Sequence, residues 1–170
     1  IKIYICGTIP NFIGNDGWHN EERRGNGRYF TTGEKNNKNE FRKEGDLQGI
    51  YMYSEGVDKN SPSWGTMALT TFIDQDISWQ LVGSPKAQFY NDFKDDGKLE
   101  PKEMQPNNDS PAALLAISKE VEPGQVAEFP FFITWHFPNR QDWMSAEVIG
   151  NYYTTQYDDA WNAAKKIVPK

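Results

Sequence analysis

The chain has 170 residues, a hydrophobic fraction of 37%, an aromatic fraction of 14% and a formal net charge of −6. This length predicts one domain with a hydrophobic core, and the aromatic content favours β-strands. The negative charge argues against nucleic acid as a partner, and no apolar run approaches the ~20 residues that a transmembrane segment needs.

The start of the chain and its cysteine content bear on the compartment without fixing it. The chain begins at Ile1 without a methionine or a signal peptide, which favours a processed or truncated start. Cys6 is the single cysteine, so no internal disulfide can form. We expect a soluble bacterial protein that is either cytoplasmic or exported.

The first part of the chain predicts one strand followed by a long loop. Residues 1–9 alternate apolar and polar side chains and end at Pro10, which predicts a β-strand. Residues 11–45 are rich in Asn, Gly, Lys, Glu and Arg and show no period. We expect an exposed excursion there, with one short strand near residues 28–32.

The middle of the chain predicts further strands with a helix between them. Tyr51 and Tyr53 would lie on one side of a strand, and residues 74–76 predict a hairpin turn. Ser84-Pro85 predicts the start of a helix that ends at Gly97. The strands predicted here are 47–54, 65–73, 77–82 and, in preference to a helix, 112–121.

The longest alternation, between residues 126 and 138, predicts a strand with one buried face. Every second position is large and apolar: Phe129, Phe131, Ile133, Trp135 and Phe137. We therefore expect Trp135 at the centre of the buried face, where replacement by alanine would cost about 3–5 kcal/mol. His136 would point to the opposite face, and we expect a hydrogen-bonded structural role for it.

The C-terminal residues 157–168 predict a helix. Asp158 and Asp159 at its start and Lys165 and Lys166 at its end suit the helix dipole. The complete set of elements predicts a mainly β fold, an antiparallel β-sandwich with one short internal helix and a C-terminal helix.

The residue types give no convincing catalytic, metal or cofactor site. The two histidines lack metal-ligand spacing, and one cysteine cannot build a zinc site. Residues 92–103 have part of a calcium-loop spacing, but Lys94 replaces a needed ligand. Asp74 and Asp76 lie at a separation that glycosidase carboxylates use, yet at a surface turn. We assign no catalytic residue and expect no hydrolysis by this chain alone.

Several segments form an ordered set that runs through most of the chain. They are residues 7–14, 65–69, 93–99, 135–140 and 151–161. The set resembles the N-terminal domain of glycoside hydrolase family 116. This family includes bacterial β-glucosidases and the non-lysosomal glucosylceramidase, also called bile-acid β-glucosidase. The resemblance is weakest over residues 15–45.

The resemblance implies an antiparallel, supersandwich-like β-sandwich that precedes a helical domain carrying both catalytic carboxylates. Residues 1–170 would be a single domain, the second half of that N-terminal sandwich, without the catalytic helical domain. The resemblance also implies that the helical domain of the same parent protein is the partner and that a β-glucoside is the substrate.

We therefore expect an accessory portion of a β-glucosidase-like hydrolase that supports the catalytic domain and shapes its substrate entrance. The expected contacts with carbohydrate or with the neighbouring domain are Trp18, His19, Arg140 and Trp143. The alternative is a free-standing carbohydrate-binding module, because aromatic rings form platforms for sugar rings. A sandwich enzyme of the mutarotase or lyase type is disfavoured, because the two histidines would lie on different strand faces.

Overall fold

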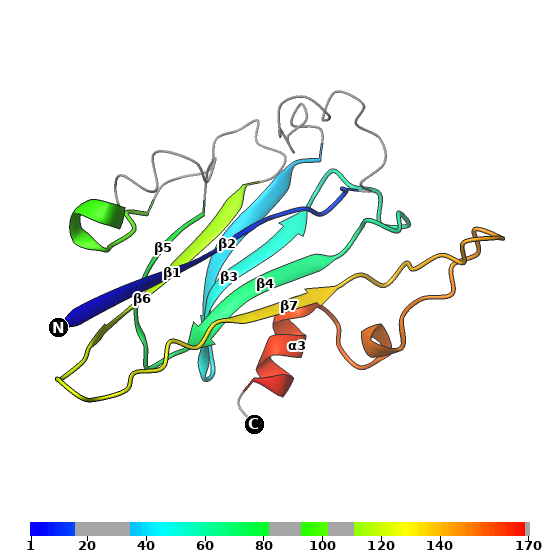
Figure 1. Cartoon of the computed structure of the whole chain (residues 1–170). Helices are drawn as coiled ribbons and strands as arrows, with labels where there is room; N and C mark the ends of the chain where they lie inside the picture. The colour runs from blue at the N-terminus through cyan, green and yellow to red at the C-terminus, as the bar shows by residue number, and fades with distance from the viewer. Residues whose placement is uncertain (16–34, 82–92, 102–110, 169–170) are drawn as a thin grey trace.

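The computed structural model describes residues 1–15, 35–81, 93–101 and 111–168, and it shows two antiparallel sheets (Figure 1). The three-stranded sheet has the order β1 (Lys2–Pro10), β6 (Ala112–Glu120) and β5 (Asp76–Gln80). The four-stranded sheet has the order β2 (Asn37–Glu44), β3 (Leu47–Ser54), β4 (Thr66–Phe72) and β7 (Phe132–His136). The 3₁₀ helix η1 (Tyr152–Thr155) and the helix α3 (Ala160–Ile167) follow β7.

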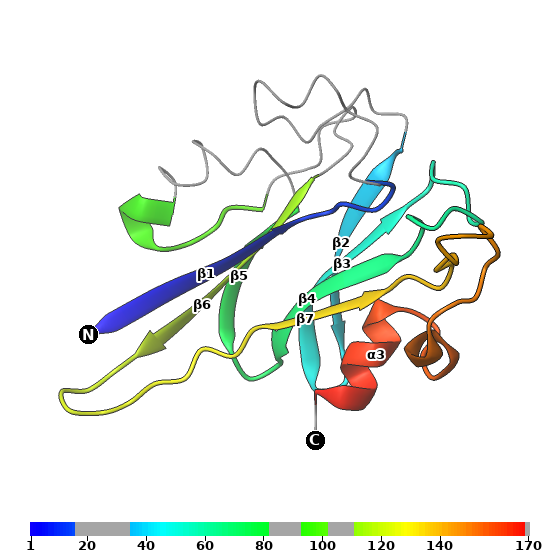
Figure 2. The ribbon, with the colours of Figure 1, turned by 45° about the vertical axis from the view of Figure 1, so that its right-hand side comes forward.

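The main hydrophobic core lies between the two sheets, which confirms the predicted mainly β sandwich. Strand β6 lies against β3 and β4, and the two sheets face each other in Figure 2. Alternate residues of each strand point into this layer. The buried residues of this core are Ile13, Ile50, Met52, Met67, Leu69, Ala113 and Leu115.

Strands β4 and β5 are consecutive in the chain but belong to different sheets, so the predicted hairpin turn at residues 74–76 is wrong. Strand β4 pairs with β3 and β7, whereas β5 pairs with β6. The connection is an arch from one sheet to the other, and buried Gln48 holds it in place. Its side-chain amide donates to three carbonyl oxygens of the arch, those of Phe72, Ile73 and Gln75, at 3.0, 3.2 and 2.9 Å.

Strand β2 lies where the sequence predicted an exposed excursion, and that prediction is wrong for residues 37–44. The strand pairs with β3 along its whole length. Its inner face carries the buried amides of Asn37 and Asn39 beside a single apolar residue, Phe41. The Asn39 amide donates to the carbonyl oxygens of Leu81 and Pro111 at 3.2 and 3.0 Å, and the Asn39 side chain accepts from Asn11 at 3.2 Å. Because these amides are hydrogen-bonded, a polar strand is stable inside the sandwich.

Short helical segments cover the outer faces of both sheets. Helix α3 packs on β3 and β4, and residues 93–96 with Leu99 cover the three-stranded sheet. Gly97 ends the helix of residues 93–96 with φ +74°, as predicted for a helix stop. The predicted helix start at residues 84–85 and the predicted strand near residues 28–32 lie outside the described residues.

Strand β7 is shorter than predicted, and the burial of its two faces is the reverse of the prediction. Ile133 and Trp135 are 49% and 56% exposed, whereas His136 is only 7% exposed. Pairing with β4 places Ile133 beside Leu69 and Trp135 beside Met67, on the inner face. Because β7 is an edge strand, this part of the inner face is left open, while α3 and η1 cover the outer face. The expected loss of about 3–5 kcal/mol for Trp135→Ala assumed a buried side chain, and the exposure of Trp135 removes that basis.

Candidate functional site

Helix α3 is fixed on the four-stranded sheet by hydrogen bonds at its first turn. The side chain of Asp159 caps the helix by accepting from the backbone N–H of Asn162 at 2.7 Å. Ala160 is held on both sides, because its N–H donates to Thr66 Oγ1 at 2.9 Å and its carbonyl accepts from Thr134 Oγ1 at 2.8 Å. The hydroxyl groups of two neighbouring strands therefore fix the position of the first turn on the sheet. The position of the helix in turn determines the surfaces on either side of it.

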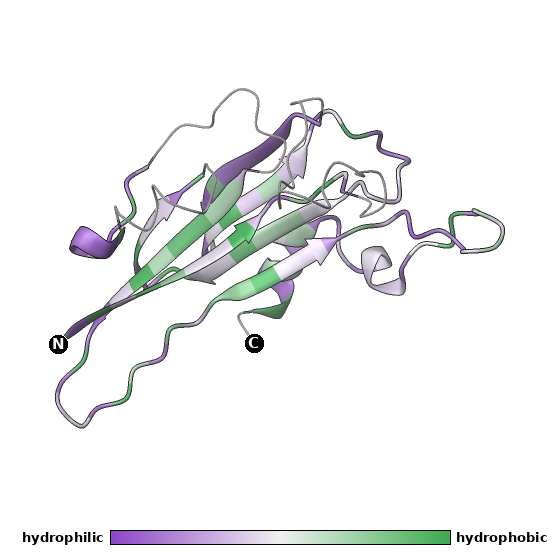
Figure 3. Ribbon diagram, turned by 45° about the horizontal axis from the view of Figure 1, so that its top comes forward, coloured by the Kyte–Doolittle hydropathy of each residue, from purple (hydrophilic) through white to green (hydrophobic). Residues whose placement is uncertain are grey.

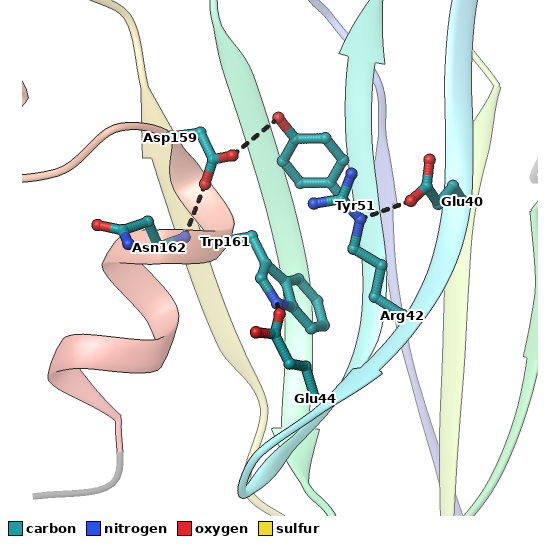
Figure 4. A network of polar contacts seen from close by, with 7 residues as sticks. All are labelled: Glu40, Arg42, Glu44, Tyr51, Asp159, Trp161 and Asn162. Atoms are coloured by element: carbon teal, nitrogen blue, oxygen red, sulfur yellow. Dashed lines mark hydrogen bonds and ion pairs between the residues drawn. The ribbon is translucent and has the colours of Figure 1, made fainter.

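Glu44, at the end of β2, holds the body of the same helix. Its carboxylate accepts from Trp161 Nε1 at 3.0 Å (Figure 4). The same carboxylate forms an ion pair with Lys165. The hydrogen bond from Lys165, followed by the bond from Trp161, lowers the pKa of Glu44 below its ordinary value of 4.5. Trp161 is only 3% exposed, so its side chain is buried between the helix and the sheet. The hydrogen bond to Glu44 satisfies its indole N–H there.

An arginine lies over a tyrosine ring beside this helix. The Arg42 guanidinium lies 3.6 Å from the centre of the Tyr51 ring, and its Nε donates to Glu40 Oε1 at 2.6 Å (Figure 4). The Tyr51 hydroxyl donates to Asp159 Oδ2 at 3.4 Å. Burial, and then the negative charge of Asp159, raise the pKa of Tyr51 to about 12. The phenol therefore stays neutral, and the guanidinium is fixed in one position.

The first candidate site is a groove of about 370 Å³ on this outer face, which we call the aromatic groove. It is lined by Glu40, Arg42, Tyr51, Tyr53, Ser54, Lys59, Trp64, Gly65 and Thr66. The Tyr51 and Tyr53 rings stack with their centres 5.8 Å apart, which confirms that they share one side of β3. The groove thus brings aromatic rings and charged side chains together.

The second candidate site is a groove of about 340 Å³ at the free edge of β7, which we call the edge groove. It is lined by Ile133, Thr134, Trp135, Tyr153, Tyr157, Ala163 and Ile167. Its surface is mostly apolar, and Ile167 on α3 is 52% exposed. The edge groove therefore joins the open inner face of the sandwich to the side of α3.

The third feature is a projecting loop, residues 139–150, that extends from the end of β7 (Figure 1). Asp142 organises its tip by accepting from the backbone N–H and the hydroxyl of Ser145, each at 2.8 Å. The Ser145 N–H, followed by its hydroxyl, lowers the pKa of Asp142. Apolar colour marks part of this loop in Figure 3. Its exposed apolar residues are Trp143 (90%), Met144 (78%), Val148 (58%) and Ile149 (57%).

The structure places only some of the residues that the sequence singled out as contacts. Arg140 and Trp143 both lie on the projecting loop and are exposed, so their contact role stays a prediction. Trp18 and His19 lie outside the described residues. His136 is buried under η1, with Nε2 3.4 Å from the Thr154 carbonyl, in agreement with a structural role.

The sequence reading missed the wall of the aromatic groove that β2 contributes. The sequence does contain a sign of this strand, because the charged residues Lys38, Glu40 and Arg42 occupy every second position. The positions between them are Asn37, Asn39 and Phe41, as in a strand with one charged face. Within the described ranges, no cluster of His, Cys, Asp or Glu could hold a metal ion. Nor is any helix in that part of the chain long and apolar enough to cross a membrane.

A comparison with models of known protein families gives a match. The family model described as beta-glucosidase 2, glycosyl-hydrolase family 116 N-term, matches residues 1–170. A search of the curated proteins finds no match. The family match covers the whole sequence, in agreement with the resemblance that the motifs indicate.

Proposed function

Because this chain belongs to the family of N-terminal domains of glycosyl-hydrolase family 116, we propose that it supports and positions the helical catalytic domain of its parent enzyme. The parent enzyme would be a glycoside hydrolase of the β-glucosidase or glucosylceramidase type. The chemistry would belong to the helical domain, since hydrolysis needs two carboxylates that flank the glycosidic bond.

The open edge of the sandwich is the observation that carries this proposal. Ile133 and Trp135 lie on the inner face, next to core residues, and yet about half of each side chain is exposed. On the facing strand β1, Ile3 and Ile5 are 37% and 41% exposed. Contiguous apolar surface of this kind is typical of a contact with another domain or chain. A helical domain seated here would cover the edge groove and the free edge of β7.

The projecting loop supports the finer part of the proposal, that this chain shapes the substrate entrance. A loop tip with a 90% exposed Trp143 and a 78% exposed Met144 is apolar enough to contact either a second domain or an aglycone. Asp142 orders this tip through its bonds to Ser145, so the turn that carries the apolar side chains has a defined shape.

The test is to produce the helical domain encoded by the same gene as a separate chain and to mix it with this one. We expect a stable complex by analytical ultracentrifugation, and hydrolysis of an aryl β-glucoside by the complex but not by this chain alone. Trp135→Ser should weaken the complex at least about tenfold, because it removes an apolar contact from the edge groove.

The matched control is Val126→Ser, which changes a residue that is 92% exposed on the connection between β6 and β7. This variant should leave complex formation unchanged. Turnover by this chain alone would contradict the proposal. A complex that Trp135→Ser and Val126→Ser weaken equally would show that the edge groove is not the contact.

A further inference from the structure

The aromatic groove combines aromatic rings with polar groups that have no partner among the described residues. In the part of the chain that the structure describes, no hydrogen bond is made by the Tyr53 hydroxyl or by the Trp64 indole N–H, and no ion pair by the Lys59 ammonium. Tyr53 and Trp64 are both partly exposed. The groove therefore offers two aromatic faces together with donors and acceptors that are free to take a ligand.

The walls of the groove are held in place before any ligand arrives. On one wall, Arg42 is fixed between the Tyr51 ring and Glu40, and its terminal nitrogens remain free among the described residues. On the other wall, the Asn139 amide donates to the carbonyl oxygens of Lys59 and Ser61 at 2.6 and 3.0 Å. Because Arg42 and the backbone of residues 59–61 are already held, these parts of the groove lose little conformational entropy when a ligand binds.

The charges of the groove indicate which class of ligand it suits. Glu40 neutralises Arg42, and the negative charges of Glu40 and Glu55 both act on the Tyr53 phenol. A strongly anionic ligand would meet this negative potential, and an apolar segment would bury the ion pair and Lys59 without compensation. A neutral ligand with many hydroxyl groups and an apolar face fits both the rings and the free polar groups.

We propose that the aromatic groove is a binding site for a neutral saccharide, separate from the edge groove. One face of a sugar ring would lie on Trp64 or Tyr53, and its hydroxyl groups would bond to Glu40, Arg42 and Lys59. This site goes beyond the proposed function and does not rest on it, because it lies on the outer face of the four-stranded sheet and needs no second domain.

The experiment is a titration of the chain with cellobiose and with methyl β-D-glucopyranoside, followed by two-dimensional NMR. We expect saturable shifts centred on the signals of Tyr53 and Trp64. Trp64→Ala should weaken binding at least about tenfold through the loss of an aromatic face. Tyr53→Phe keeps the ring and should weaken binding about threefold through the loss of one hydroxyl group.

The control is Tyr152→Phe, which removes a hydroxyl from a tyrosine that is 82% exposed and lies outside the groove. It should leave binding unchanged, and circular dichroism should show all three variants folded. If Trp64→Ala does not fold, Tyr53→Phe and Glu40→Gln decide the question. The absence of shifts with both sugars overturns the proposal, and so does tighter binding of glucuronate or inorganic phosphate. Equal weakening by Tyr53→Phe and Tyr152→Phe also overturns it.

Discussion

Both edges of the sandwich carry large apolar residues, but these residues are packed together at one edge and exposed at the other. At the edge formed by β2 and β5, Phe41 and Trp79 come from opposite sheets and stack with ring centres 4.6 Å apart and planes 6° apart. At the edge formed by β1 and β7, the apolar side chains of Ile133 and Trp135 are about half exposed. One edge is sealed by an aromatic pair, and the other is left open.

The difference shows that large apolar residues at a sheet edge do not by themselves close a core. Closure needs a partner on the facing sheet, and Phe41 provides one for Trp79. On the open side, the backbone of β1 has Gly7 opposite Phe131, so no side chain from β1 extends across at that point. The open edge is thus available for a contact with a second domain, while the closed edge stabilises the chain itself.

The largest expected effect on stability is at the closed edge. Trp79→Ala should lower the free energy of unfolding by about 3 kcal/mol, because it removes a partly buried indole and leaves Phe41 without its stacking partner. Urea unfolding measures this change. Trp79→Phe should retain more than half of the stability, and an unchanged urea midpoint for Trp79→Ala would show that the ring pair does not seal the edge.

A smaller effect is expected at the open edge in the chain alone. Trp135→Ala should cost about 1 kcal/mol, because more than half of the side chain is already in water. The same urea experiment gives the comparison with Trp79→Ala. Equal losses for the two variants would mean that both edges are closed in solution.

Acid should loosen the helix that forms one wall of the edge groove. The pKa of Glu44 is lowered by Lys165 and then by Trp161, so Glu44 contributes stability above its ordinary pKa of 4.5. This contribution is lost as the pH falls through the lowered pKa of the folded state. Glu44→Gln should therefore have a lower melting temperature than the unchanged chain near neutral pH, and the difference should vanish in acid. A difference that is independent of pH would contradict the role of this charge.

The smallest effect is expected where β1 meets the open edge. A Cβ at Gly7 would lie 3.2 Å from Cδ1 of Phe131, so the ring must move by a few tenths of an ångström. Because Phe131 is only partly buried, Gly7→Ala should cost less than about 1 kcal/mol. The thermal midpoint measures this cost, and a loss as large as that of Trp79→Ala would show that Phe131 is held rigidly.

Local patterns in the sequence determined most of the strands. Residues 47–54 are strand β3 with the predicted bounds, and the strand chosen over a helix at residues 112–121 is β6. The C-terminal helix begins after Asp159 and has Lys165 and Lys166 in its last turn, as expected. Alternation, capping residues and charges at helix ends act over a few neighbours, which is why they can be read from the sequence.

The candidate site was far less predictable. Strand β2 reads as a loop because two of the three inward positions are asparagines, Asn37 and Asn39. The burial of Asn39 depends on hydrogen bonds to residues distant in the sequence, such as Leu81 and Pro111. The aromatic groove combines Arg42 from β2, Tyr53 from β3 and Trp64 from the loop that follows β3. No local pattern indicates that these three residues meet.

The sequence by itself determined that β7 is a strand and which of its residues share a face, because side chains alternate along any extended chain. Only the tertiary structure decided which face is buried. Helix α3 and η1 cover the side of His136, and the facing sheet leaves the side of Trp135 open. The physical reason is that burial is not a property of a residue's own segment but of the surfaces that other segments bring against it.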